Sequence, residues 1–446
     1  MLKIPGLPLA LLLTIPLFAQ TPTPSKEVQA ASAESYKLYV DLHEHPELSS
    51  HETKTAATLA ARLRSLGYDV TENVGGTGIV AVMKNGVGST IMLRTELDAL
   101  PVQEKTGLAY ASKVTAKDDS GKEVPVMHAC GHDVHMASII GTAEVMAQSK
   151  NTWHGTLVLI GQPAEETISG AKAMIADGLM TKFPKPDAMV ALHVGNSLPA
   201  GKVGYTAGYI SSNADSIKIT IFGKGSHGSQ PHNSIDPIVL GAKIVLALQT
   251  IPSREVRPGE PVVVTVGYFQ AGLKNNIIPD EARLGLTVRT YDPNVRKHVL
   301  ASIDRIVKGE AEAAGVQKLP LVVHDEATDA VYNDPALAKA MTAVLVKALG
   351  KENVEEEPPS MTSEDFSYFV AQGVPGFYFS LGGANPQKWA EAKAAGEKLP
   401  SNHSPLFAPD AKPAIETGIT AEVAVLRDLL NTSPAELKQL TASAVK

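Results

Sequence analysis

The sequence predicts an α/β fold with a mostly parallel sheet between layers of helices, interrupted by an inserted ferredoxin-like α+β domain. Short apolar runs alternate with helical stretches at both ends of the chain, which is typical of a parallel sheet covered on both faces. The middle of the chain follows the order β-α-β-β-α-β instead. With 446 residues, the chain is longer than one ordinary core accommodates, so two domains are expected.

The main part of the chain is predicted to begin with two helices, after a segment at 21–30 that we expect to be a flexible linker. Five apolar runs then predict buried strands, and helical stretches lie between and after them. The predicted helices are Ser32–His43, Thr53–Leu66, Met136–Gln148, Ala171–Asp177, Pro335–Leu349 and Lys412–Leu430. The predicted strands are Ile79–Met83, Thr90–Arg94, Thr156–Gly161, Ala188–His193 and Phe377–Leu381.

Residues 210–325 carry the second pattern and are predicted to form the inserted domain. The main domain is therefore expected to be discontinuous, at 21–209 and 326–446. The predicted strands of the insertion are Ser216–Phe222, Val262–Phe269, Arg283–Thr290 and Leu319–His324, and its predicted helices are Pro237–Leu248 and Val295–Ala314.

Residues 1–20 have the pattern of a secretory signal peptide, with Lys3 before an apolar run at 7–18 and a cleavage site after Ala19 or Gln20. An uncleaved anchor is the alternative, but the run is short for a span of about 20 residues. No later stretch is long and apolar enough to cross a bilayer. The sequence therefore predicts export, to the periplasm or to the outside.

Composition excludes several classes of function. With 44% hydrophobic residues, 20% charged residues and a net charge of −7, the chain has no basic stripe, so nucleic acid is not an expected partner. The single cysteine, Cys130, cannot form an internal disulfide. Most free cysteines are buried as small apolar residues, so its neighbours must decide its role.

Metal-binding side chains follow several predicted strands at the point where each strand ends. In an open α/β sheet, ligands bind at the carboxyl ends of the strands. These ends meet at one edge of the sheet, so the side chains that follow them are expected to lie close together. They are Glu96, Asp98, Glu165, Glu166, His193 and His403, joined by Cys130 and His132 of the loop at 127–133.

Thiolate, imidazole and carboxylate groups together suit zinc and similar first-row metals. Five candidate ligands exceed the needs of one tetrahedral ion, so a two-ion site with a bridging group is predicted. The candidates are Cys130, His132, Glu166, His193 and His403.

The adjacent pair Glu165-Glu166 indicates a hydrolase. In a non-helical loop two successive side chains diverge, so one carboxylate can bind metal while the other takes a proton from water that a metal has made acidic. We assign Glu166 to metal and Glu165 to the general base, although order alone allows the reverse. A nucleophilic Cys130 is a rival, but it leaves the other candidate residues unexplained.

Seven motifs resemble those of the hippurate hydrolase and auxin-conjugate hydrolase amidohydrolases, which belong with the metallopeptidases related to aminoacylase. The resemblance runs in order from about Tyr36 to Leu430. The motifs are DLHEHPEL at 41–48, LDALP at 97–101, MHACGHD at 127–133, QPAEE at 162–166, NIIP at 276–279, SEDF at 363–366 and NHS at 402–404.

This resemblance implies a function and roles for the main-domain residues. It implies Glu165 as the base, Cys130 as a thiolate that bridges two divalent ions, and Asp98 as a residue that orients the site. The other metal ligands would be His132, Glu166, His193 and His403. The ions expected are zinc or manganese, with cobalt or nickel as alternatives.

The resemblance also implies that the inserted domain is a lid and dimerisation domain, and that the protein is a homodimer or a higher homo-oligomer. His227, in GSHGSQP at 225–231, would stabilise the oxyanion when the lid closes. Asn276 and Arg289 would contact the substrate, Arg289 through a carboxylate. The alternative is that Arg289 pairs with a neighbouring acid of its strand, but substrate contact is favoured.

The expected activity is metal-dependent cleavage of the amide bond in N-acyl amino acids or similar small conjugates. A dipeptidase or an N-acetyl deacetylase with the same site is an alternative, and a non-catalytic metal-dependent binding protein is another. Two positions depart from the family pattern: Glu96 stands where Asp is usual, and Val134 where Gly is usual. Glu96 is expected to change the surroundings of the ligands, and Val134 to narrow the pocket.

Overall fold

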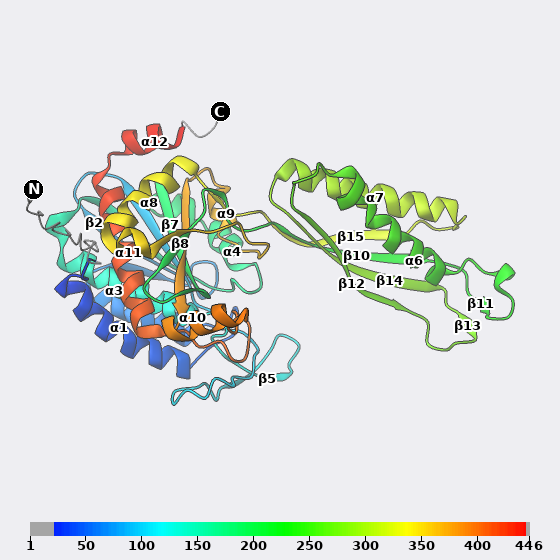
Figure 1. Cartoon of the computed structure of the whole chain (residues 1–446), viewed down its shortest axis with the longest axis horizontal. Coiled ribbons are helices and arrows are strands. Elements are labelled where there is room, and N and C mark those ends of the chain that lie inside the picture. The colour runs from blue at the N-terminus through cyan, green and yellow to red at the C-terminus, as the bar shows by residue number, and fades with distance from the viewer. Residues whose placement is uncertain (1–21, 443–446) are drawn as a thin grey trace, which may run out of the picture.

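The structure is a computed structural model that describes residues 22–442, so the predicted signal segment at 1–20 lies outside the described residues. Figure 1 shows a compact body that carries both ends of the described chain and an elongated unit that projects from it. The body contains a sheet of ten strands, and the projecting unit contains a sheet of four. The fold is therefore mixed α/β with a mostly parallel central sheet, as predicted.

Four neighbouring parallel strands form the centre of the large sheet, in the order β6, β3, β7 and β18. They span Gly155–Gln162, Thr90–Glu96, Ala188–Pro199 and Gly376–Ala384. The register aligns their carboxyl ends, because Glu96 lies opposite Gln162 and His193 lies opposite Ser380. The side chains that follow these strands therefore meet at one edge of the sheet.

Helices cover both faces of this sheet. On β6, Leu157 and Leu159 face one core and the alternate residues Val158 and Ile160 face another, as the period of two in a strand requires. The first core is closed by α1 (Lys26–Glu44), α2 (Thr53–Ser65), α3 (His132–Gln148), α8 (Pro335–Leu349) and α11 (Ala411–Asn431). The second is closed by α4 (Gly170–Ala176), α5 (Leu179–Lys182) and α9 (Ser367–Val370).

The expectation of a linker through residue 30 was wrong, because α1 begins at Lys26. The side chain of Ser25 accepts a hydrogen bond from the backbone N–H of Val28 and caps this helix. Several short elements were also not predicted, since too few residues carry their pattern. They are β1 (Asp69–Glu72), β4 (Thr115–Lys117), β5 (Glu123–Pro125), β8 (Val203–Tyr205), β9 (Gly208–Tyr209), β16 (Tyr332–Asn333), β17 (Val354–Glu356), α10 (Pro386–Ala395) and α12 (Pro434–Ala442).

The remaining strand of the large sheet, β2, spans Ile79–Asn85. Within 22–442, no helix has the length and apolar content needed to span a bilayer.

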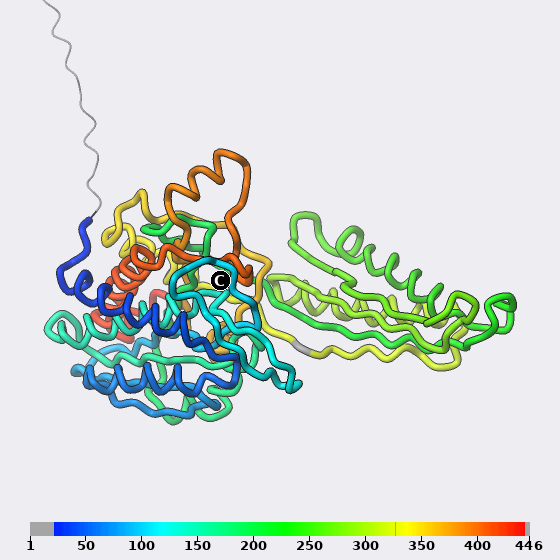
Figure 2. Tube along the Cα trace, turned by 90° about the horizontal axis from the view of Figure 1, so that it is seen from below, coloured from blue at the N-terminus to red at the C-terminus, as the bar shows by residue number. Residues whose placement is uncertain are grey.

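The projecting unit follows the predicted β-α-β-β-α-β order. Its antiparallel sheet has the strand order β12, β14, β10, β15, and both helices pack on one face over a separate apolar core. Figure 2 shows the same separation from the body in a second view. The elements are β10 (Ala214–Phe222), α6 (Pro237–Leu248), β12 (Val262–Ala271), β14 (Glu281–Thr290), α7 (Pro293–Ala313) and β15 (Leu321–Thr328), with the short β11 (Ser226–His227) and β13 (Ile277–Ile278) at the tip farthest from the body (Figure 1).

Three helices start with the same Asp-Pro pair. Asp236, Asp292 and Asp334 each accept hydrogen bonds from two backbone N–H groups in the first turn of α6, α7 and α8. The ring of the proline that follows fixes its backbone angle φ at a helical value. Proline also lacks the backbone N–H that would otherwise need a hydrogen-bond partner in the first turn. These pairs fix where each helix begins.

One buried acid makes the stability of the body depend on pH. Glu422 on α11 is completely buried and accepts a 2.6 Å hydrogen bond from Thr142 on α3. Burial raises the pKa of Glu422 to about 8 from an ordinary value of 4.5. The folded state therefore holds this proton at a pH where the unfolded chain releases it, and stability falls as pH rises from about 4.5 to 8.

Replacing Glu422 with Gln keeps a partner for Thr142 and removes this titration. We expect Glu422→Gln to unfold like the parent near pH 5 and to be more stable at pH 8, by on the order of 1–3 kcal/mol. Urea unfolding of both proteins across this range measures the difference. A difference that does not change with pH would contradict the assignment.

Candidate metal centre and active site

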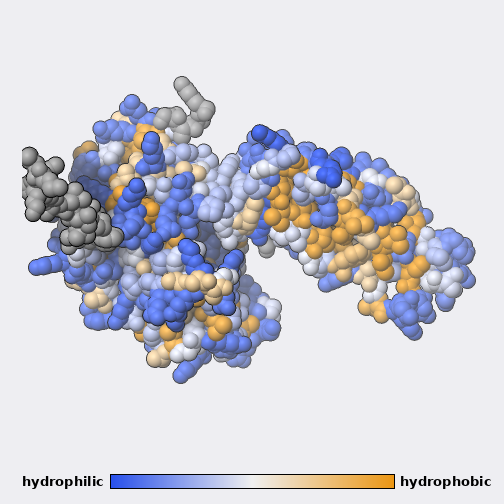
Figure 3. Space-filling view, in the orientation of Figure 1, coloured by the Kyte–Doolittle hydropathy of each residue, from blue (hydrophilic) through white to orange (hydrophobic). Residues whose placement is uncertain are grey.

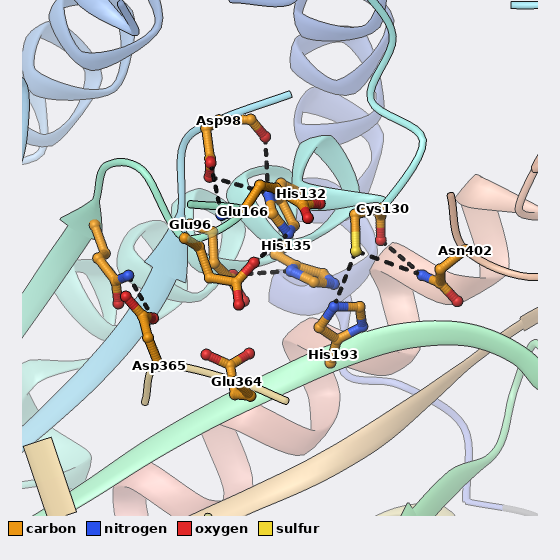
Figure 4. Close-up of polar contacts among 12 residues, drawn as sticks. Glu96, Asp98, Cys130, His132, His135, Glu166, His193, Glu364, Asp365 and Asn402 are labelled. Atoms are coloured by element: carbon orange, nitrogen blue, oxygen red, sulfur yellow. Dashed lines mark hydrogen bonds and ion pairs between the residues drawn. The ribbon is translucent and has the colours of Figure 1, made fainter. Parts of the chain in front are cut away.

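The predicted metal ligands converge at the carboxyl edge of the large sheet. Figure 4 shows four of them, which are Cys130, His132, Glu166 and His193. Ligand atoms of Cys130, His132 and His193 all lie within 4.8 Å of one another, and so do those of Cys130, Glu166 and His403. The thiol of Cys130 belongs to both groups. The geometry therefore offers two adjacent ligand sets that share one sulfur atom.

Backbone geometry places the loop at 127–133 against β7. Gly131 has φ +88°, and a Cβ atom on it would lie 2.4 Å from a methyl carbon of Val194. Only glycine fits, because both the left-handed conformation and the close approach exclude a side chain. Cys130 precedes this turn and His132 opens α3, so the two side chains leave the chain in directions that allow both to reach the site.

Hydrogen bonds set the tautomers of two imidazoles. His132 donates from Nδ1 to the backbone carbonyl of Asp98 at 2.7 Å, and His193 donates from Nδ1 to the carbonyl of Val194 at 2.9 Å. Each ring in its neutral form then has an unprotonated Nε2 that can bind metal. The Nε2 atom of His132 is buried and has no hydrogen-bond partner, and that of His193 lies 3.4 Å from the sulfur of Cys130.

Asp98 holds two of the metal-binding groups. Its Oδ1 lies 3.4 Å from Nδ1 of His132, and its Oδ2 accepts hydrogen bonds from the backbone N–H of Glu166 at 2.9 Å and from Ser49 at 2.6 Å. One carboxylate therefore orients a ring from α3 and the loop that carries Glu166.

Two loops that carry site residues, at Ala164 and at His403, have strained backbone conformations. Ala164, before Glu165, has φ +48° and His403 has φ +68°, conformations that non-glycine residues rarely adopt. Hydrogen bonds hold both in place: Ala164 donates its N–H to Glu52 at 2.8 Å, and His403 donates its N–H to the carbonyl of Ala129 at 2.8 Å. Such strain persists only where the surroundings enforce it.

The charge balance of the site favours cations. Burial lowers the pKa of His132, but the hydrogen bond to Asp98 and the nearby carboxylates outweigh it and raise that pKa to about 10. Burial and the neighbouring His135 lower the pKa of His193 to about 3, so this ring is neutral and can bind metal. Burial and the charges of Glu166 and Glu165 raise the pKa of the Cys130 thiol. A divalent ion beside the sulfur supplies the positive charge that a thiolate needs.

One oxygen of Glu166, Oε1, is buried with no hydrogen-bond partner, and the other lies 3.3 Å from Nε2 of His403. Together with the unpartnered Nε2 of His132, it marks polar atoms that water or a metal ion must satisfy. The mixed sulfur, nitrogen and oxygen donors fit first-row divalent metals.

Glu165 lies beside the metal-binding groups and is almost fully buried. Burial, followed by the negative charges of Glu364 and Glu166, raises the pKa of Glu165 well above its usual value. Its carboxylate lies within 4.8 Å of those of Glu364 and Asp365. Its place between these acids and the metal-binding groups lets Glu165 exchange a proton with a water molecule at the site, which is the task of a general base.

A buried ion-pair cluster around Arg94, which was not predicted, lies behind Glu165. Arg94 is completely buried and contacts Glu96, Glu364 at 2.7 Å and Asp365 at 3.2 Å. Its signal in the sequence is a charged residue inside an otherwise apolar strand. Asn402 was also missed, although it adjoins His403: its amide donates to the carbonyl of Cys130 at 2.8 Å and joins the last loop to the metal loop.

The two departures from the family pattern have different consequences. Glu96 pairs with Arg94 and lies 2.9 Å from Nδ1 of His135, whose Nε2 accepts a hydrogen bond from the N–H of Val194 at 2.8 Å. Glu96 therefore supports the strand that carries His193. Val134 is completely buried in the main core. The expectation that Val134 narrows the pocket was wrong, because its side chain packs between helices and sheet.

Three residues expected to act from the inserted domain are not brought to this site. His227 and Asn276 are neighbours at the far tip, where the N–H of Gly228 donates to the carbonyl of Asn276 at 2.9 Å (Figure 1). Nδ1 of His227 accepts a hydrogen bond from the N–H of Ser229 at 3.1 Å, which leaves Nε2 to donate outward. Arg289 lies on β14 and donates to Thr287 at 3.3 Å.

Comparison with known proteins places the chain in a family. The family model described as "Peptidase family M20/M25/M40" matches residues 92–402. A hippurate hydrolase from Campylobacter jejuni is 39% identical over 77% of this chain and 86% of its own length. An N-acetyl-L-cysteine deacetylase from Bacillus subtilis is 35% identical over 78% and 80%.

Among solved structures, a protein from Bacillus subtilis described as a dinuclear metal-binding peptidase of the M20 family superposes with a TM-score of 0.72 at 29% identity. The match covers 91% of this chain and all of that one. The matched residues include Asp98, Cys130, His132, Glu165, Glu166 and His193, and the match ends one residue before His403. This chain belongs to the peptidase family M20/M25/M40.

Proposed function

We propose that this protein is a metal-dependent amidohydrolase that cleaves the amide bond of N-acyl amino acids or similar small conjugates. The observation that carries the proposal is the pair of ligand sets that share the Cys130 sulfur, with the buried carboxylate of Glu165 beside them. Hydrolysis of acyl amino acids is also what the names of the hippurate hydrolase and the deacetylase describe. A dipeptidase with the same site remains the second candidate, because the family name is that of peptidases.

Two divalent ions would be held by Cys130 as the shared ligand, with His132, Glu166, His193 and His403 completing the sets. Zinc or manganese suits these donors best, and cobalt or nickel would also fit. When bound, the ions polarise the scissile carbonyl and lower the pKa of the attacking water.

The chain's own residues carry out the proton transfers. Glu165 takes the proton of the water during attack and gives it to the leaving nitrogen, so the products are a carboxylic acid and an amine. Asp98 keeps His132 and the Glu166 loop in position through the hydrogen bonds described above. Arg289 would bind a substrate carboxylate, since a fixed fork of N–H donors matches a carboxylate.

A homodimer would supply the residues that one chain leaves far from the metals. The inserted domain exposes apolar side chains on α6 and on the edge strand β12, where hydrogen-bonding groups also lack a neighbouring strand (Figure 3). They include Ile238, Val239, Leu246, Tyr268 and Phe269. Pairing of two copies along this edge would cover the apolar surface, and His227 and Asn276 of one copy would reach the metal site of the other.

The signal pattern of residues 1–20 supports export of the protein to the periplasm or to the outside. There it would act on small conjugates that arise outside the cytoplasm.

Metal removal and loss of Glu165 should each abolish hydrolysis. Chelator-stripped protein is offered a panel of N-acyl amino acids, dipeptides and N-acetyl amines, with and without added zinc or manganese. We expect activity to return with metal, and Glu165→Gln to lower kcat by about 10²–10⁴-fold, the contribution typical of a general base. Glu34→Gln is the control, because Glu34 is exposed on α1 and pairs with Lys37, which is also exposed. Activity that ignores metal and survives Glu165→Gln would favour a Cys130 nucleophile instead.

Cys130→Ala should lower the metal content itself. Loss of the shared sulfur removes one ligand from both sets, so we expect fewer than two metal ions per chain by elemental analysis after dialysis. Glu165→Gln keeps all five ligands and is expected to retain two ions per chain. Equal metal content in both variants would show that Cys130 is not a ligand.

Mixing two inactive variants tests whether the partner copy supplies His227. Glu165→Gln and His227→Ala each inactivate both sites of a homodimer. In a mixed dimer, the site of the His227→Ala chain keeps its own Glu165 and receives an intact His227 from the Glu165→Gln chain. Random exchange should restore roughly a quarter of the parent activity, because half of the dimers are mixed and each has one good site. Light scattering gives the oligomeric state. A dimer that shows no restoration after proven exchange would place His227 in its own chain's site.

A further inference from the structure

Both chain connections between the body and the inserted domain rest on one short segment, residues 360–368, which we call the brace segment. The outgoing connection, which leads from the body to the inserted domain, contacts the start of the brace segment. Ser360 donates its N–H to the carbonyl of Ile210 at 2.9 Å, and Ser212 donates its N–H to Thr362 at 2.9 Å. The hydroxyl of Ser212 adds a 3.0 Å hydrogen bond to the carbonyl of Met361. This connection therefore lies along the brace segment as an added strand would.

The returning connection is bound at the other end of the brace segment. The hydroxyl of Tyr368 donates to the carbonyl of Ala327. The hydroxyls of Ser367 and Thr328 lie 3.1 Å apart, and both residues are almost fully buried. Lys172 on α4 donates to the same Ala327 carbonyl at 3.3 Å and lies 4.4 Å from the centre of the Tyr368 ring.

The inserted domain is attached firmly to both connections. Arg296 on α7 forms a two-pronged ion pair with Asp215, at 2.9 and 2.7 Å, and binds Asp329 at 2.6 Å. Asp215 lies on β10, where the outgoing connection enters the inserted domain. Asp329 directly follows β15, where the returning connection leaves that domain. A rotation of the inserted domain must therefore move both connections together.

A pocket of about 370 Å³ lies beside these connections, with residues of the body and of the inserted domain in its walls. It is lined by Thr206 and Tyr209 on one side and by Pro261, Tyr291 and Val295 on the other.

The middle of the brace segment forms the wall behind the base. Glu364 and Asp365 lie between the two bound ends, and both pair with Arg94. Asp365 also accepts hydrogen bonds from Gln162 at 2.7 Å and from the N–H of Ala171 at 3.1 Å. Their carboxylates lie within 4.8 Å of that of Glu165, so a shift of this segment changes the space and the charge that Glu165 meets.

We propose that the brace segment couples the orientation of the inserted domain to the placement of Glu165, with Tyr368 and Glu364 as positioning residues. This inference rests on the proposed function of Glu165 as the base. Close-packed interiors transmit small displacements instead of absorbing them. A rotation of the inserted domain would act through Tyr368 and Lys172 on the elements that flank the base.

A double-mutant cycle tests the coupling, because proximity alone does not prove it. Tyr368→Phe removes the hydroxyl bound to Ala327 and keeps the ring, and Glu364→Gln removes the charge and keeps the shape. We expect Tyr368→Phe to lower kcat by about 3–10-fold with KM changed less than about twofold, and to have less than about a twofold effect in a Glu364→Gln background. Tyr68→Phe is the matched control, because the buried Tyr68 hydroxyl likewise donates to a backbone carbonyl, that of Ala143 at 3.1 Å, and this variant should leave kcat unchanged.

Two kinetic results would overturn the proposal. An equal loss of kcat from Tyr368→Phe in both backgrounds would mean that the two residues act independently. A lower melting temperature with unchanged kcat would mean that Tyr368 only stabilises the fold.

Hydrogen exchange provides a measurement that needs no substrate, so it decides the matter even if the parent protein hydrolyses none of the panel. Peptides covering 163–170, the loop that carries Glu165, should exchange about threefold faster or more in Tyr368→Phe than in the parent. Faster exchange confined to the connection at 325–332 would overturn the coupling. Absence of hydrolysis by the parent, in contrast, would count against the proposed function alone.

Discussion

Negative charge buried at the carboxyl edge of the large sheet is the constraint on which the rest of the structure depends. Glu96, Asp98, Glu165 and Glu364 all lie there with almost no exposure to solvent. Burial of unpaired carboxylates is costly, so positive charge must be supplied on every side of them. On one side the chain provides it, through the guanidinium of Arg94. On the other side the ligand atoms of three imidazoles, a thiol and a carboxylate remain available, and divalent cations would supply the positive charge there.

The backbone around the site is arranged to keep these groups in place before any ion binds. Main-chain carbonyls hold the two buried rings by their Nδ1 atoms, and Asp98 joins one ring to the acidic loop. Glycine at 131 lets the metal loop approach β7, while Ala164 and His403 adopt strained conformations that neighbouring hydrogen bonds enforce. Preorganisation of this kind avoids the cost of ordering ligands at the time of binding. It also explains why the site draws residues from loops far apart in the sequence.

The inserted domain adds a unit with its own apolar core to the body. As a cover over the site it could move as a whole, because only two connections join it to the body. The exposed apolar edge of this domain and the distant position of His227 are the observations that support the proposed homodimer. Both connections contact residues 360–368, so the proposed movement of the cover and the surroundings of the base share one structural element.

The sequence by itself determined the fold class, the order of the long elements and the residues that gather at the sheet edge. Apolar runs and helical periods are local properties, and the parallel topology brings the ends of β3, β6 and β7 together wherever it forms. Helix and strand ends were less certain, as the start of α1 at Lys26 shows, since one capping hydroxyl decides them. Short strands such as β9 and β16 had too few residues to show a pattern.

Only the tertiary structure decided which partners each charged group meets. Arg94 lies next to Glu96 along the chain but is 270 residues from Glu364, and no local pattern reports such a pairing. Val134 stands beside metal-loop residues in the sequence and yet packs into the core, because a helix turns each successive side chain by a fixed angle. The sequence thus named the chemical groups of the site, whereas their tautomers, their burial and their distance from His227 depend on contacts between segments that only folding brings together.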